Sequence, residues 1–91
     1  MAVRGMVVDA LSGTPVKGVM LSFASNVNYD GNPAAIALVK KTAEKGRFII
    51  KSIASGMYTV TVQKVGYMDQ STTVAVADGE LTVLNFQLSK N

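Results

Sequence analysis

The side chains that could do chemistry in this 91-residue chain are six carboxylates, because the chain contains neither histidine nor cysteine. Without histidine, Ser-His-Asp and Cys-His triads, the usual zinc ligand sets and the commonest general base are excluded. Two carboxylates that converge in space would still make a glycosidase pair. The acids fall mostly in expected turns or at strand ends: Asp9, Asp30, Glu44, Asp69, Asp78 and Glu80. A chain this short offers little room for a deep cleft, so we predict a protein that is not an enzyme and carries no cofactor.

A polar segment offers a second kind of chemistry, the binding of a cation or another ligand. Asn26, Asn28 and Asp30 alternate and precede a glycine, as in the first half of a calcium loop. The bidentate Glu of such a loop is missing, because Ala37 holds its position. We therefore interpret the segment as a loop whose Asn and Asp side chains bond their own backbone, and predict no metal site. The candidate ligand-binding residues are all in this loop: Asn26, Asn28, Tyr29, Asp30 and Asn32.

These residues must be positioned by strands, because apolar residues alternate with polar ones along the chain. The clearest stretch has Phe48 and Ile50 in one run and Tyr58, Val60 and Val62 in the next. Seven runs recur about every ten residues, as in an all-β sandwich or barrel: 3–9, 16–24, 34–43, 47–53, 57–64, 71–77 and 81–88. The third run also fits a helical turn at 33–37, although we prefer a strand. The last three residues are expected to fray.

The runs suit two sheets of three or four strands packed face to face in one domain covering residues 1–91. The side chains expected to form the core come from both sheets: Phe23, Phe48, Ile50, Val60, Val62, Val76, Phe86 and Leu88. Truncation of one such aromatic side chain should cost roughly 3–5 kcal/mol.

The composition points to a partner and argues against nucleic acid. The net charge is only +3 and the lysines are spread along the chain, whereas nucleic-acid binding needs a clustered basic patch. Only 16% of residues are charged, so part of the surface is apolar or neutral and suits contact with a neighbour, or weak self-association through edge strands. No run of apolar residues is long enough to cross a membrane. We expect an exported protein whose leader is not in this chain, with a cytoplasmic location left open.

An ordered set of residues spans nearly the whole chain. The opening carries Gly5 and Asp9, and the centre carries Gly46 and Phe48, then Gly56 and Tyr58, then the pair Gly66 and Tyr67. Together with Gly18 and Ile53, these positions resemble the carboxypeptidase regulatory-like domains. The resemblance implies an all-β, seven-stranded antiparallel Greek-key sandwich of the transthyretin-like (prealbumin-like) type. It also implies a non-catalytic accessory module that docks a neighbouring domain or a protein partner.

Two related kinds of sandwich suggest alternatives. Starch-binding-like sandwiches suggest a carbohydrate-binding or cell-surface ligand-binding module that uses loop 25–33, where Tyr29 is the aromatic residue most clearly exposed. Collagen-adhesin stalk repeats join a first-strand lysine to a last-strand asparagine. Here Asn85 stands in the last run, but the first run carries Arg4 and no lysine, so we predict no such bond.

The two later tyrosines are expected to have structural roles. Tyr67 should fold its ring over one end of the sandwich while its hydroxyl bonds the backbone, as a tyrosine corner does. Stacking of Tyr58 or Tyr67 on a ligand is the alternative to packing in the core or at the corner. The glycines at 46, 56 and 66 are expected at turns.

Overall fold

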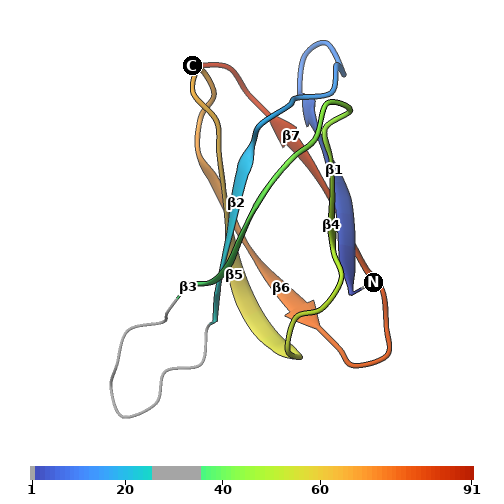
Figure 1. Cartoon of the computed structure of the whole chain (residues 1–91). Coiled ribbons are helices and arrows are strands. Elements are labelled where there is room, and N and C mark those ends of the chain that lie inside the picture. Colours follow the sequence, from blue (N-terminus) through green and yellow to red (C-terminus); the bar gives the residue numbers. More distant parts are fainter. Residues whose placement is uncertain (1, 26–35) are drawn as a thin grey trace, which may run out of the picture.

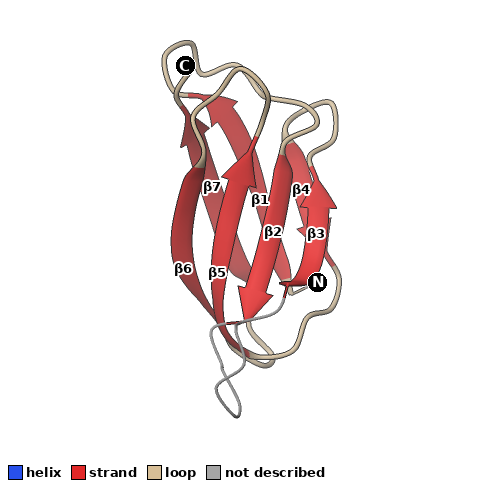
Figure 2. Ribbon diagram, turned by 90° about the vertical axis from the view of Figure 1, so that its left-hand side faces the viewer, coloured by secondary structure: helices blue, strands red, loops and turns tan. Residues whose placement is uncertain are grey.

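The computed structural model describes residues 2–25 and 36–91, and these form a sandwich of two β-sheets (Figure 1). The strands are β1 (Val3–Asp9), β2 (Met20–Ser25), β3 (Ile36–Lys41), β4 (Arg47–Ile50), β5 (Gly56–Gln63), β6 (Gln70–Val76) and β7 (Thr82–Leu88). One sheet has the order β4-β1-β7 and the other β3-β2-β5-β6. Figure 2 shows the two sheets facing each other. The prediction of an all-β protein with seven strands in two sheets is confirmed.

The strand directions differ from the prediction in one place. All pairs are antiparallel except β1 and β7, which run parallel in register from Val3 opposite Thr82 to Asp9 opposite Leu88. A short hairpin forces its two strands to be antiparallel, but β1 and β7 are separated by every other strand. Their relative direction is therefore set by the closure of the whole sandwich, which the local pattern does not reveal.

The second and fourth strands are shorter than their predicted runs. Residues 16–19 do not pair as a strand but cross from one sheet to the other over Thr42. The buried Thr42 hydroxyl accepts from the Val19 amide (3.0 Å) and donates to the Val16 carbonyl (2.8 Å). The fourth strand ends at Ile50 and not at residue 53. The third run is a strand from Ile36, and residues 33–35 lie outside the described part of the chain.

The core lies between the sheets and contains almost all of the residues that the sequence predicts to form it. Seven of the eight are buried, whereas Phe86 is half-buried and packs against the others. The β1 residues that face this core are Val3, Gly5, Val7 and Asp9, at every second position. Burial of one large apolar side chain is worth about 1.5–3 kcal/mol, so this row anchors the three-stranded sheet.

Two glycines allow close approach of backbones where a side chain would not fit. A Cβ on Gly5 would lie 1.8 Å from the Leu84 carbonyl oxygen and 2.6 Å from the Phe48 ring. Gly46 has a positive φ of 70°, and a Cβ there would lie 2.4 Å from the Val7 carbonyl oxygen. Gly46 instead accepts a hydrogen bond from the Val7 amide (2.8 Å). Both positions therefore require glycine for packing at β1.

The end of the chain is tied down, contrary to the expectation of fraying. The Met68 amide donates to the Ser89 carbonyl (2.8 Å), and the Asn91 amide donates to the Gly66 carbonyl (3.1 Å). The turn between β5 and β6 thus holds the tail by backbone bonds, a contact far apart in sequence that a polar composition does not predict. Among the described residues, no helix has the length and apolar character needed to span a bilayer.

Candidate functional site

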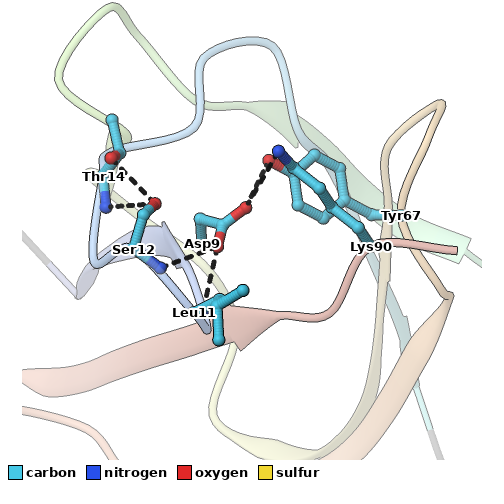
Figure 3. A network of polar contacts seen from close by, with 6 residues as sticks. All are labelled: Asp9, Leu11, Ser12, Thr14, Tyr67 and Lys90. Carbon is cyan, nitrogen blue, oxygen red and sulfur yellow. Dashed lines mark hydrogen bonds and ion pairs between the residues drawn. The ribbon is translucent and has the colours of Figure 1, made fainter.

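Among residues 2–25 and 36–91, Asp9 is the one acid whose side chain is buried, and it ends the inward row of β1. Its Oδ1 accepts hydrogen bonds from the amides of Leu11 (2.9 Å) and Ser12 (3.0 Å). Its Oδ2 accepts one from the Tyr67 hydroxyl (2.9 Å) and lies 3.8 Å from Lys90 Nζ. Figure 3 shows the carboxylate between these groups. Asp9 therefore joins three segments at one end of the sandwich: the turn after β1, the turn after β5 and the tail.

The electrostatics of this cluster suit a structural tie and not a catalytic acid or base. Hydrogen bonds from the Ser12 and Leu11 amides and from Tyr67, together with the Lys90 charge, lower the Asp9 pKa from 3.8 to about 2 against the opposing effect of burial. The same bond raises the pKa of Tyr67 above its ordinary value. A general base works best with a pKa near the working pH. Asp9 instead stays ionised near neutral pH, and both of its carboxylate oxygens accept hydrogen bonds.

The partner of the Tyr67 hydroxyl differs from the prediction. The sequence predicts that this hydroxyl bonds the backbone, but it donates to the Asp9 side chain. The bond to backbone is made by Tyr58, whose hydroxyl donates to the Ala54 carbonyl four residues earlier (2.6 Å). The Tyr58 ring is buried and meets Phe23 edge-on, with centroids 6.3 Å apart. The sequence pattern could not distinguish the two tyrosines, because the acid that captures Tyr67 lies 58 residues away.

No other acids gather into a site in residues 2–25 and 36–91. Glu44, Asp69, Asp78 and Glu80 are all exposed. No group of three or more His, Cys, Asp or Glu that could hold a metal ion occurs among these residues. The candidate ligand-binding loop lies outside the described residues, so its role stays a prediction: Asn26, Asn28, Tyr29, Asp30 and Asn32.

The remaining residues of the family pattern have positions that suit structural roles. Phe48 is buried over Gly5, and Ile53 is half-buried against the core. The backbone has a positive φ at Gly18, Gly56 and Gly66, each in or beside a turn. None of these residues presents a reactive group to solvent.

The surface that suits binding is the side of the three-stranded sheet that faces away from the core. We call this surface the outer face and define it by Arg4, Met6, Arg47, Ile49, Val83 and Asn85. The strand register places Ile49, Arg4 and Val83 in one row and Arg47, Met6 and Asn85 in the next. Together these residues line a shallow hollow of about 450 Å³.

The outer face combines exposed aliphatic side chains with unpaired positive charge. Ile49 is 47% exposed and Val83 is 50% exposed, although both lie within strands. Neither Arg4 nor Arg47 forms an ion pair within residues 2–25 and 36–91, and none of the residues lining the hollow is acidic. Alternation along one strand predicts which of its side chains point outward. It does not give the register between strands, and the register decides which outward side chains of β4, β1 and β7 become neighbours.

The outward side of the four-stranded sheet is different. Its middle rows carry hydroxyl side chains that stand opposite one another in the register: Ser22, Thr61 and Ser71 in one row, and Thr59 and Thr73 in the next. Exposed aliphatic residues lie toward its margins, at Val39 and Met57. Both arginines of the chain lie on the three-stranded sheet, beside aliphatic residues around the hollow.

Asn85 lies on the outer face opposite Met6, in a hollow lined by two arginines and no lysine. This placement sets it beside groups that cannot form an isopeptide bond with it.

Comparisons with known proteins agree with this architecture. A family model described as carboxypeptidase regulatory-like domain matches residues 2–89. A search of curated protein sequences returned no match. Among solved structures, a group B streptococcus pilus 2b backbone protein is 18% identical with a TM-score of 0.73. The match covers 98% of this chain and 40% of that protein, so the chain spans less than half of its length.

Two enzymes share the fold at the same low identity. A Klebsiella pneumoniae 5-hydroxyisourate hydrolase is 18% identical with a TM-score of 0.66, over 100% of this chain and 92% of the hydrolase. A 3-chlorocatechol 1,2-dioxygenase from Rhodococcus opacus 1CP is 18% identical with a TM-score of 0.69, over 98% and 59% of the two chains. At this identity the likenesses establish a transthyretin-like fold, which hosts several activities.

Proposed function

Because the chain belongs to the carboxypeptidase regulatory-like domain family, we propose that it is a non-catalytic accessory module that docks a neighbouring domain or a partner protein through its outer face. The observation that carries the proposal is the outer face itself. Its exposed aliphatic and cationic side chains lie together on three strands around one hollow. Clustered exposed apolar residues with polar neighbours are typical of interaction surfaces.

The chemistry of the described residues supports a module without catalytic activity. The one buried acid, Asp9, is held ionised by its partners and ties three segments together. The hydrolase and the dioxygenase share only the fold, so their reactions do not transfer to this chain.

We propose that the module belongs to an exported or cell-surface protein. Its match to less than half of a pilus backbone protein suits a unit that is repeated or combined with others along a longer surface chain. A domain in such a chain needs a face for its neighbour, and interfaces between domains are typically mixed apolar and polar surfaces.

Site-specific photo-crosslinking tests the docking role. A photoreactive amino acid at position 49, in the full-length product of the gene expressed in its own cells, should yield a cross-link to one defined domain or protein. The matched control carries the same amino acid at position 73, on the outward side of the other sheet. Equal cross-linking from the two positions, or none from position 49, would contradict a docking role for the outer face.

A further inference from the structure

The strand β4 ends its sheet and leaves part of its backbone open. The Gly46 carbonyl accepts from the Val7 amide, and the Ile50 carbonyl accepts from the Ala2 amide, so these groups point toward β1. Alternate residues of a strand point their backbone groups to opposite sides. The amide and carbonyl of Ile49 therefore point away from β1, where no strand pairs with β4 among residues 2–25 and 36–91.

The open edge is limited at one end. The Arg47 carbonyl also points away from β1, but it accepts a hydrogen bond from the Ala43 amide (2.9 Å). The open groups are thus centred on Ile49, whose side chain lies on the outer face. A peptide that paired with this edge would set one of its own side chains directly opposite Ile49. Ala43 already holds the position opposite Arg47, so the peptide could meet Arg47 only through the Arg47 side chain on the outer face.

The charge on this edge selects the kind of segment that fits. Arg47 lies on the edge strand, and Arg4 stands opposite Ile49 on β1. Both guanidinium groups lack an acidic partner within the described residues, and none of the residues lining the hollow is acidic. A carboxylate that reaches the Arg47 guanidinium would gain a charge-assisted hydrogen bond, and an aliphatic side chain opposite Ile49 would cover exposed apolar surface.

A second copy of this chain fits the edge poorly. Antiparallel pairing of two β4 strands around Ile49 would bring Lys51 of one copy toward Arg47 of the other, at a position that Ala43 already holds. Like charges directly opposite each other are destabilising, and both chains carry a net charge of +3. An acidic segment avoids this repulsion.

Resting on the docking role proposed above, we propose that the partner contributes an extended acidic segment that adds as a strand to the open edge of β4. The segment carries an aliphatic residue opposite Ile49 and, two positions from it, an acidic residue whose carboxylate meets the Arg47 guanidinium on the outer face. Addition of a strand to a sheet edge is a recurring mode of peptide recognition, in which backbone bonds give affinity and alternate side chains give specificity.

The test is an NMR titration of the isotope-labelled 91-residue chain with blocked synthetic peptides. The probe has the sequence Thr-Glu-Thr-Val-Thr-Glu-Thr. It has one Glu two residues before Val and one two residues after it, so the peptide can pair in either strand direction. Its controls replace both Glu by Gln, or N-methylate the central Val to block the backbone bond. We expect amide shifts centred on Arg47 and Ile49, with binding about tenfold weaker for the Gln peptide and lost for the N-methyl peptide.

A charge reversal on the protein completes the test. Arg47→Glu should weaken binding of the Glu peptide by about tenfold or more. Lys41→Glu makes the same kind of charge change on the exposed edge strand of the other sheet, and should change the affinity less than about twofold.

Three results would overturn the proposal: equal binding of the Glu and Gln peptides, shifts centred elsewhere than β4, or no shift at millimolar peptide. A dimer in sedimentation equilibrium that Ile49→Lys abolishes would also overturn it, because the occupant would then be a second copy. If the peptide test fails while position 49 still forms its cross-link, the docking role stands with a partner of different chemistry. If position 49 also forms no cross-link, both the docking role and the acidic segment are contradicted.

Discussion

The two faces of the three-stranded sheet consist of alternate residues of the same strands, yet they differ in how strongly the fold constrains them. Ile50 is 4% exposed and its neighbour Ile49 is 47% exposed. Toward the core, every second residue of β1 is constrained. Val3 and Val7 are fully buried, Gly5 lies against Leu84 and Phe48, and Asp9 is hydrogen-bonded to Tyr67. Away from the core, the arginines and aliphatic residues have no such constraint. The difference teaches that one face of the sheet carries stability, which leaves the opposite face free for the docking role that we propose.

The largest effect should come from removing the aromatic ring on the inner face. Phe48→Ala leaves a cavity over Gly5 and should lower the free energy of unfolding by roughly 3–5 kcal/mol. Ile49→Ala, one residue along, should change it by less than about 0.5 kcal/mol because that side chain is half exposed. Denaturant unfolding of both variants measures the difference. Similar losses in the two variants would break the comparison between the faces.

A nearly equal effect should follow from adding one methyl group to the inner face. A Cβ at Gly5 would meet the Leu84 carbonyl oxygen at 1.8 Å, and a backbone atom in a paired strand cannot easily move. We expect Gly5→Ala to cost about 3 kcal/mol, the upper end of the range for overpacking. Arg4→Ala, on the outer face, serves as the control and should melt within a few degrees of the parent in calorimetry. An unaffected Gly5→Ala variant would show that β1 and β7 are not so close.

A smaller effect, with a defined pH dependence, should come from Asp9 at the end of the inner row. Its pKa is about 2 in the folded chain and ordinarily 3.8, so its contribution to stability is present above pH 3.8 and is lost as the pH falls through about 2. Asp9→Asn should therefore be less stable than the parent at pH 7, and the gap should shrink between pH 4 and pH 2.

Denaturant unfolding at several pH values checks the Asp9 prediction, with Asp69→Asn as an exposed control. A gap between Asp9→Asn and the parent that is constant from pH 7 to pH 2 would mean that the Asp9 carboxylate has no special environment.

The smallest effect on stability should be found on the outer face, where the effect on binding should be large. Val83→Ser removes half-exposed apolar surface and should change the free energy of unfolding by no more than about 0.5 kcal/mol. The same change should reduce cross-linking from position 49, because Val83 shares a row with Ile49 across Arg4. Quantification of the cross-linked product, with Thr73→Ser as the control, would sharpen the comparison. Unchanged cross-linking would limit the docking surface to β4 and β1.

Much of the inner face could be predicted from the sequence, because alternation is a property of each strand alone. Phe48 and Ile50 were assigned inward from their spacing, and both are buried. Phe86 fits the pattern but is half-buried, since burial also depends on how far the opposite sheet extends. The parallel pairing of β1 with β7 depends on closure of the entire sandwich, which no local pattern encodes.

The candidate site was harder to predict because it depends on contacts between distant residues. The bond from Tyr67 to Asp9 joins two positions that the family pattern contains but does not connect. The outer face arises from the register of three strands, so Arg4, Ile49 and Val83 become neighbours only in the folded sheet. Composition gave one useful signal, since a charged fraction of 16% implied apolar surface without locating it.

Amide hydrogen exchange at the adjacent residues Ile49 and Ile50 most directly tests the proposed docking of a partner at the open edge of β4 beside the outer face. It should be measured in the isolated chain and in the full-length gene product purified with its bound partners. Ile50, whose backbone faces β1, should be protected in both samples, whereas Ile49 should exchange rapidly in the isolated chain and become protected only in the second. Rapid exchange at Ile49 in both samples, or protection in both, would contradict the account.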